Sequence, residues 1–185
     1  MVGTLTLYMG CMYSGKTSIL IREYYRWKSI NKKTLVINHS MDNRYTTESK
    51  LFNHDCVSIP CLLTNKLSDI DNEIIDQVEA IFINEGQFFD DLKTTVIDWC
   101  ENKNKHLFIA GLDADRHRQA FGQMLDLIPY ADEYHKMLAK CQKCLDGTNA
   151  PFTYCEVRSD QQILVGCSEY EPLCRFHYLE KISKS

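Results

Sequence analysis

The stretch "YMGCMYSGKTSIL", Tyr8 to Leu20, determines how the rest of the 185-residue chain is interpreted. It holds a glycine at position 10, four further residues, and then Gly15-Lys16-Thr17, which is the pattern of a phosphate-binding loop. A short β-rich run precedes it, and a segment with helical spacing of apolar residues follows it. Glycines let backbone N–H groups surround phosphate oxygens, and the first helical turn adds the positive end of its dipole. We therefore predict a nucleoside triphosphate site here.

The residues of this loop have different expected roles. Lys16 should reach the β- and γ-phosphates of ATP, and the hydroxyl of Thr17 should coordinate Mg²⁺. A chance match to the pattern is the alternative, and the strand before it and the helix after it make chance less frequent. The predicted phosphate-binding residues are Gly10, Cys11, Met12, Tyr13, Ser14, Gly15, Lys16 and Thr17.

Composition and charge narrow the class of protein. The chain is 44% hydrophobic and 25% charged, with a formal net charge of −4 and no long run of Lys or Arg. A basic patch is the usual mark of a nucleic-acid binder, so we expect no nucleic-acid partner. No signal-peptide pattern occurs, and no apolar run approaches the roughly 18 residues of a membrane span. We expect a cytoplasmic protein without a membrane partner, whose nine cysteines are metal ligands or small buried hydrophobes.

Strand-like and helix-like segments alternate along most of the chain. The expected strands cover residues 4–10, 34–38, 80–84 and 106–112. The expected helices cover residues 16–30, 68–77, starting at a serine cap, and 90–103, capped by acidic residues. This alternation predicts an α/β fold, in which a parallel sheet carries helices on both faces.

The character of the sequence changes near Lys140. From "CQKC" to "CRFHY" there are turn residues and short β-like pieces, "FTYCEV" and "QQILVGC", with little helical periodicity. We therefore predict an ATP-binding P-loop domain over residues 1–139 and a small zinc-binding domain over residues 140–185.

The end of the third expected strand, in "AIFINEGQFF", supplies a candidate catalytic acid. Glu85 could accept a proton from an attacking hydroxyl, and a solvated strand-end acid is the alternative reading. A neighbouring Asn84 stands where such proteins place an aspartate beside Mg²⁺. It can accept a hydrogen bond but brings no charge, so either Mg²⁺ binds more weakly or another carboxylate compensates, with Asp42, Glu85 and Asp113 as the candidates. We assign Thr17, Asn84 and Asp42 to the magnesium site.

The loop "DNRY" adds a cation to the same edge of the sheet. Arg44 could stabilise charge on the transferring phosphoryl group, together with Lys16. A surface ion pair between Asp42 and Arg44 is the alternative. The loop "GLDADRHR" follows the last expected buried strand, so it could also contribute charged residues to this edge of the sheet. A solvated surface loop without a functional role is the alternative.

Two pairs of residues near the C-terminus have the spacing of zinc ligands. Cys141-x-x-Cys144 and Cys174-x-x-His177 each leave a two-residue gap, and twenty-nine residues separate the pairs. Four protein ligands leave no position for water, which predicts a structural zinc. Cys155 and Cys167 lie between the pairs and are alternative ligands.

Taken in order, these motifs resemble the type II thymidine kinase family. The residues that carry the resemblance are "GCMYSGKT", "DNRY", "NEGQFF", "AGLDAD", "CQKC" and "CRFHY", and they span nearly the whole chain. The resemblance implies a RecA-like P-loop domain and a zinc domain with a lasso loop over the nucleoside. It implies transfer of the ATP γ-phosphate to the 5′-hydroxyl of thymidine, with Mg²⁺ and a structural Zn²⁺. It also implies a homotetramer. We expect deoxyuridine to be accepted too, because a missing methyl group in an apolar pocket costs only about 1–3 kcal/mol.

The resemblance also assigns individual residues. It implies that Glu85 is the general base. The residues that it implies contact the nucleoside are Met12, Phe88, Leu112, Thr153, Val165, Gly166 and Tyr170.

This chain departs from the family's usual pattern at several positions. It has Asn84 in place of an aspartate, Arg116 in place of a common aromatic residue, and His177 in place of a common cysteine. The lasso is one residue shorter between Gly166 and Tyr170.

Three other functions are compatible with the residues. One is a broader-specificity deoxynucleoside kinase or an ATPase with the same loop. Another is a zinc-ribbon P-loop ATPase that binds nucleic acid, against which the net charge of −4 argues. The last is a catalytically inactive regulatory homologue, an alternative that remains because Asn84 replaces the expected aspartate of the magnesium site.

Overall fold

A parallel sheet of six strands forms the centre of the protein. The structure is a computed structural model that describes residues 2–42, 49–53, 56–156 and 170–184. The strand order is β5-β2-β6-β7-β1-β8, and every neighbouring pair is parallel. The strands are β1 (Thr4–Gly10), β2 (Thr34–His39), β5 (Leu62–Thr64), β6 (Ala80–Asn84), β7 (His106–Gly111) and β8 (Glu133–Met137).

The burial of a strand explains whether it could be predicted from the sequence. All five residues of β6 are buried, as is typical of a parallel strand covered on both faces. At one margin of the sheet, β8 has four exposed residues in a total of five. Its polar sequence therefore carries no hydrophobic pattern, and this strand was not predicted.

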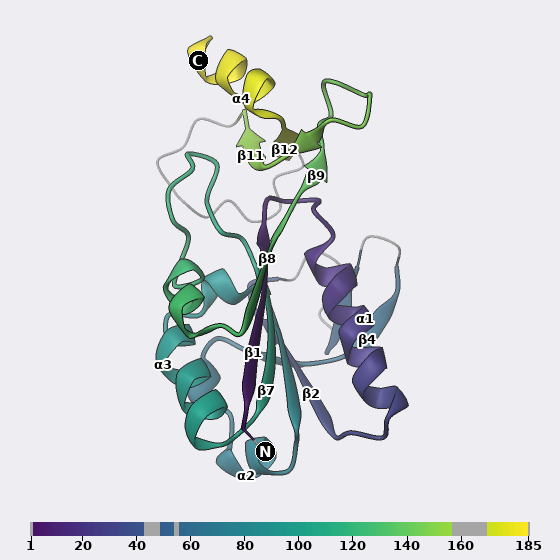
Figure 1. Ribbon diagram of the computed structural model, residues 1–185, viewed down its shortest axis with the longest axis vertical. Helices are drawn as coiled ribbons and strands as arrows, with labels where there is room; N and C mark the ends of the chain where they lie inside the picture. Colours follow the sequence, from purple (N-terminus) through teal and green to yellow (C-terminus); the bar gives the residue numbers. More distant parts are fainter. Residues whose placement is uncertain (1, 43–48, 54–55, 157–169, 185) are drawn as a thin grey trace.

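Helices cover the two faces of the sheet (Figure 1). On one face, α1 (Lys16–Ser29) packs Leu20 and Ile21 against residues of β2, β6 and β7 such as Phe82. The other face carries α2 (Asn72–Asp76), α3 (Leu92–Ile97), the π-helical turn η3 (Asp98–Asn102) and the 3₁₀ turns η1 (Leu67–Asp69), η2 (Gly86–Phe88) and η4 (Leu125–Tyr130). The predicted α/β fold class is thus confirmed.

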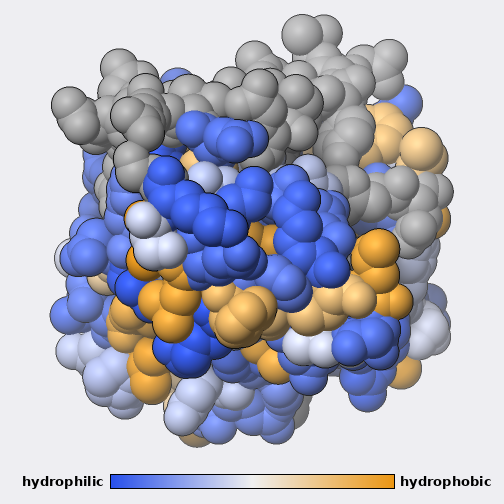
Figure 2. Space-filling view, turned by 90° about the horizontal axis from the view of Figure 1, so that it is seen from above, coloured by the Kyte–Doolittle hydropathy of each residue, from blue (hydrophilic) through white to orange (hydrophobic). Residues whose placement is uncertain are grey.

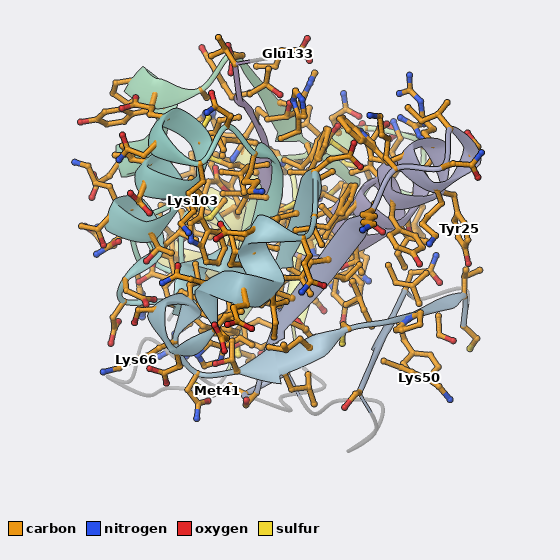
Figure 3. The ribbon with its side chains drawn as sticks, turned by 90° about the horizontal axis from the view of Figure 1, so that it is seen from below. Tyr25, Met41, Lys50, Lys66, Lys103 and Glu133 are labelled. Atoms are coloured by element: carbon orange, nitrogen blue, oxygen red, sulfur yellow. The ribbon has the colours of Figure 1, made fainter. Side chains whose placement is uncertain are left out.

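Two views along the long axis show the protein from its two ends. From above, hydrophilic side chains form a broad band across the molecule, with hydrophobic ones beside it (Figure 2). From below, Tyr25 of α1 and Lys103, which follows η3, lie on opposite sides of the sheet (Figure 3).

The residues after β8 build a separate small core above the sheet (Figure 1). Two short antiparallel pairs, β9 (Ala139–Lys140) with β10 (Asn149–Ala150) and β11 (Phe152–Cys155) with β12 (Tyr170–Leu173), precede α4 (Arg175–Ser183). A further antiparallel pair, β3 (Lys50–Phe52) with β4 (Ser58–Pro60), lies over the α1 side of the sheet. Tyr178 of α4 is 2% exposed, and Cys11 of the phosphate loop belongs to the same small core. The boundary at residue 139 stays a prediction.

Local details differ from the sequence-based expectations. The expected serine cap before α2 is wrong: Asp71 is the N-cap, and its carboxylate accepts a hydrogen bond from the N–H of Glu73 at 2.9 Å. Asp91 occupies the N-cap of α3, but its carboxylate accepts from the N–H groups of Leu67 and Ser68 instead.

Two further outcomes concern the C-terminal segment. Helix α4 was not predicted, because its nine residues carry only a weak apolar periodicity. The expected β-like piece over residues 161–167 lies outside the described residues. Within the described ranges, no helix is long and apolar enough to span a membrane.

Candidate active site and metal centre

The phosphate loop connects the carboxyl end of β1 to the start of α1. Gly10 has φ 155°, and a Cβ there would lie 2.2 Å from the carbonyl oxygen of Met137, so this position requires glycine. Gly15 has φ 82°, a left-handed conformation that starts the helix. The ammonium of Lys16 donates to the carbonyl oxygen of Cys11 at 2.6 Å, across the loop. The loop therefore has the closed shape and the central cation that phosphate binding needs.

A chain of side-chain hydrogen bonds crosses the sheet edge beside this loop. The Thr17 hydroxyl donates to Oδ1 of Asn84 at 3.2 Å, and Nδ2 of Asn84 donates to Oδ1 of Asn38 at 3.0 Å. Nδ2 of Asn38 then donates to Oδ2 of Asp42 at 3.1 Å. Both amides are 2% exposed. The structure thus brings together Thr17, Asn84 and Asp42, the three residues predicted for magnesium.

The chemistry of these donors suits Mg²⁺. A hydroxyl, an amide carbonyl and a carboxylate are hard oxygen groups of the kind this ion prefers. The carboxylate of Asp42 supplies a negative charge that Asn84 lacks. In Figure 3, Met41, which precedes Asp42, lies near Lys66, which follows β5, at the margin of the sheet where β2 and β5 pair.

Glu85 follows β6 in a left-handed conformation, with φ 53° and ψ 42°. This conformation is uncommon for a residue with a side chain and turns the chain sharply at the strand end. Nε2 of Gln87 donates to the Glu85 carboxylate at 2.6 Å, while Oε1 of Gln87 accepts from the N–H of Leu112 at 2.9 Å. Gln87 is 3% exposed. Gln87 therefore links the Glu85 carboxylate to the backbone of Leu112, which follows β7, and so holds the carboxylate in place.

Aromatic rings border this edge of the sheet. The half-buried ring of Phe88 lies 5.5 Å from His39 and packs edge-to-face on Phe121 at 5.7 Å, centroid to centroid. Burial lowers the pKa of His39, so the ring is neutral at pH 7 and its Nδ1 accepts from the N–H of Met41 at 3.1 Å. The result is an apolar, aromatic wall of the kind that binds a flat base.

The C-terminal segment contacts the phosphate loop directly. Sγ of Cys11 donates to the carbonyl oxygen of Ala150 at 3.1 Å, and the N–H of Met12 donates to Oγ1 of Thr153 at 3.0 Å. A cavity lies at this junction, lined by Cys11, Asp113, Arg118, Lys136, Phe152 and Thr153 among others. The loop's shape therefore depends on the small core above it.

Four potential metal ligands converge in that small core. The ligand atoms of Cys141, Cys144, Cys174 and His177 all lie within 4.8 Å of one another. Nδ1 of His177 lies 3.6, 3.4 and 3.3 Å from the three sulfur atoms, and two of the sulfurs are 3.7 Å apart. A tetrahedral zinc with ligand bonds of about 2.0–2.3 Å separates its ligand atoms by roughly 3.5–3.8 Å. The geometry fits a structural Zn²⁺.

Backbone groups prepare this cluster for a metal. Burial opposes ionisation of Cys141, but N–H groups of Cys174, Cys144 and Lys143 outweigh it and lower the pKa of Cys141 to about 6. A thiolate, which is the form that binds zinc, is thus present at neutral pH. Cys155, weighed as an alternative ligand, lies on β11 and is not one of the four clustered residues.

Comparison with known proteins identifies the family. A sequence model described as "Thymidine kinase" matches residues 3–178. A thymidine kinase from Oryza sativa subsp. japonica is 35% identical over 184 residues, covering 96% of this chain and 67% of that protein. One from Choristoneura fumiferana entomopoxvirus is 35% identical over 188 residues, covering 96% and 97%. The cytosolic thymidine kinase of Bos taurus is 33% identical over 186 residues, covering 98% and 74%.

The chain belongs to the thymidine kinase family.

Within this thymidine kinase fold, four of the residues predicted to contact the nucleoside lie around the same edge of the sheet. Met12 lies in the phosphate loop and Phe88 in the aromatic wall, while Leu112 is tied to Gln87. Thr153 is 6% exposed and accepts from the loop. Tyr170 starts β12, in register with Cys155. Their roles toward a nucleoside stay predictions.

Some predicted positions lie outside the described residues. They are Arg44, Val165, Gly166 and the alternative zinc ligand Cys167.

Sequence reasoning missed several residues that shape the site. Asn38 and Gln87 orient Asn84 and Glu85, and His39 and Phe121 flank Phe88. For Asn38 and His39 a signal existed, because polar residues that end a buried strand face the ligand edge of such sheets. Gln87 and Phe121 come together only through packing.

Proposed function

We propose that this protein transfers the γ-phosphoryl group of ATP to the 5′-hydroxyl of thymidine. The observation that carries this proposal is the convergence of Lys16, Thr17 and Glu85 at one edge of the sheet, in a chain of the thymidine kinase family. A phosphate cradle, a set of magnesium oxygens and a carboxylate base are what phosphoryl transfer to an alcohol requires. The product is the nucleoside 5′-monophosphate, formed in nucleotide salvage.

In this proposal, each residue near the reaction handles charge or a proton. Lys16 and Arg44 neutralise the charge that develops on the phosphoryl oxygens. Thr17, Asn84 and Asp42 would hold Mg²⁺, which would supply positive charge to offset that of the nucleotide phosphates. Glu85 accepts the 5′-hydroxyl proton while that oxygen bonds to the γ-phosphorus. The bond from phosphorus to the β-phosphate oxygen breaks, and its electron pair leaves with ADP.

The nucleoside is proposed to bind between the aromatic wall and the C-terminal segment. Phe88 would pack against the base, with Met12, Leu112, Thr153 and Tyr170 around it. Val165 and Gly166 of the predicted lasso complete this proposed set. The thymine methyl group would occupy an apolar pocket, where its absence costs only about 1–3 kcal/mol. Deoxyuridine is therefore a proposed second substrate, used with roughly 5- to 150-fold lower efficiency.

The zinc site is proposed to act through structure. Cys141, Cys144, Cys174 and His177 would complete a tetrahedron, which leaves no position for an activated water. Cys11 joins the phosphate loop to the same small core. The metal would therefore keep the cradle in shape while taking no part in the chemistry.

Assembly and location are also proposals. We propose a cytoplasmic homotetramer that binds neither nucleic acid nor membrane. The family resemblance supports this, as does the similarity to a cytosolic thymidine kinase of cattle. Helix α4 also exposes apolar side chains, with Phe176 at 71%, Leu179 at 44% and Ile182 at 41%. Light scattering coupled to size-exclusion chromatography measures the assembly, and a monomer at working concentration would contradict it.

The test of the activity is phosphoryl transfer from γ-labelled ATP. Thymidine, deoxyuridine and deoxycytidine are compared with a reaction lacking nucleoside. We expect label in thymidine monophosphate, less in deoxyuridine monophosphate and little in deoxycytidine monophosphate. Similar use of all three would instead show a broad-specificity kinase. Release of phosphate without nucleoside would show an ATPase, and no reaction would show an inactive homologue.

A further inference from the structure

Asn38 is the penultimate residue of β2, at the ligand edge of the sheet, and no motif assigns it a role. Strands β2 and β6 pair in parallel with Asn38 in register with Asn84, so the two amides lie side by side. Each is 2% exposed, and they hydrogen-bond to each other at 3.0 Å. Buried polar side chains need partners, so this pair fixes both of its members.

The orientation of the Asn84 amide matters for a cation. An amide presents an acceptor oxygen on one side and an NH₂ donor on the other. Because Asn38 accepts from Nδ2 of Asn84, the oxygen of Asn84 faces the Thr17 hydroxyl. A reversed amide would present hydrogen atoms to the side where Mg²⁺ is proposed to bind. A carboxylate in this position would face no such choice, because it has two oxygens.

Asp42 sets the direction of the whole chain of hydrogen bonds. Its carboxylate only accepts, so Asn38 must turn its NH₂ group toward Asp42, at 3.1 Å. The Asn38 oxygen must then face Asn84. Reversing Asn84 would place two carbonyl oxygens against each other, and reversing both amides would place an oxygen against a carboxylate.

We propose that Asn38 is a positioning residue, which transmits the acceptor-only character of Asp42 to Asn84 and keeps the Asn84 oxygen on the metal side. Asn38 thereby compensates for the aspartate that this chain lacks at position 84, the end of β6. The identity of the metal-bound nucleotide rests on the proposed function. The orientation of the amide does not.

The test compares Asn38→Leu in two backgrounds, the natural chain and Asn84→Asp. Mn²⁺ replaces Mg²⁺ as a paramagnetic probe, and its affinity for the protein–ADP complex is measured by electron paramagnetic resonance at pH 8. Residues that orient metal ligands typically contribute about 10- to 100-fold to metal affinity. We expect Asn38→Leu to weaken Mn²⁺ binding at least tenfold in the natural chain. With Asn84→Asp present, the loss should be about threefold or less, because a carboxylate offers an oxygen in either orientation.

Two further variants complete the test. Asn102→Ala removes an exposed amide that binds Asp98 at the opposite end of the sheet, and it should leave Mn²⁺ affinity unchanged. Asn38→Ser keeps a hydroxyl that can accept from the Asn84 amide and donate toward Asp42, so it should lose less Mn²⁺ affinity than Asn38→Leu. It also keeps the inference testable if Asn38→Leu does not fold.

The outcomes separate the inference from the proposed function. An equal loss in both backgrounds, no loss in either, or a loss by Asn38→Ser as large as that by Asn38→Leu would overturn the role of Asn38. If the natural protein phosphorylates no nucleoside and the predicted Mn²⁺ pattern is still found, the proposed function fails alone. If thymidine is phosphorylated and the pattern is absent, the positioning role fails alone.

Discussion

Replacing Glu85 by Gln tests the proposed base with little change in shape. Gln keeps the length of the side chain and an oxygen that can accept from Nε2 of Gln87, the bond that is 2.6 Å long in the natural chain. It cannot accept a proton from the 5′-hydroxyl at neutral pH. The substitution therefore removes the chemistry and keeps the position.

The expected losses of catalytic rate and of folding stability can both be estimated. A positioned general base contributes about 10²- to 10⁴-fold, which is about 2.7–5.4 kcal/mol of activation free energy. The bond to Gln87 changes from a charge-assisted to a neutral hydrogen bond, which costs about 1 kcal/mol of unfolding free energy. For a chain of this length that corresponds to a fall in melting temperature of about 2–4 °C. The kinetic loss should therefore far exceed the structural one.

The assay measures initial rates of phosphoryl transfer to thymidine with both substrates varied. We expect kcat to fall at least 100-fold, by the general-base estimate, with ATP affinity by calorimetry unchanged. Glu101→Gln, which neutralises an exposed acid in η3, is the matched control and should keep full activity. Near-full kcat for Glu85→Gln would refute the assignment. An increase in KM for thymidine with kcat unchanged would show that Glu85 binds the nucleoside and is not the base.

Three further predictions test the supporting structure. Cys174→Ser should reduce bound zinc, measured by mass spectrometry, below one ion per chain and lower the melting temperature, because one tetrahedral ligand is lost. An unchanged zinc content would contradict the site. Gly122→Ala should lower the unfolding free energy by more than about 2 kcal/mol in urea titrations, because φ is 56° and the new Cβ would meet the Gln87 carbonyl oxygen at 2.2 Å. Gly147→Ala, at φ 88° in open space, should cost only about 1 kcal/mol, and equal losses would argue against the clash. Asp91→Ala should lower stability by about 1–2 kcal/mol at pH 7, because two N–H groups lose their acceptor. Burial opposes a low pKa for Asp91, but those N–H groups outweigh it, so the contribution is complete above the unfolded pKa of about 3.9 and is lost as pH falls through the lower folded pKa. A difference between wild type and variant that does not shrink as the pH falls below about 3.9 would contradict this.

Much of the fold could be predicted because its signals are local. The apolar run "AIFIN" is a strand buried on both faces. Residues 16–29 form the helix that was expected directly after the glycine-containing phosphate loop. Where burial is weak, the same reasoning failed. Strand β8 is mostly exposed, and α4 has only a weak apolar face, so neither carries a strong pattern.

The candidate site divides in the same way. Lys16, Thr17 and the four residues of the metal cluster were predicted from spacing alone, because the residues within each motif lie only a few positions apart. Asn38 and Gln87 were not found. Their partners lie on other elements, so their roles depend on strand register and on how the loops pack.

The sequence by itself determined a phosphate loop between a strand and a helix, an acid at a strand end, and two pairs of metal ligands. Turn geometry, helix dipoles and tetrahedral ligation act over a few residues, so a linear pattern is enough to specify them. The tertiary structure decided that Asn84 is oriented by Asn38 and Asp42, and that the loop at Met12 hydrogen-bonds to Thr153. These contacts join residues 46 and 141 positions apart. Only the order and register of the strands, set by burial of the whole core, could bring them together.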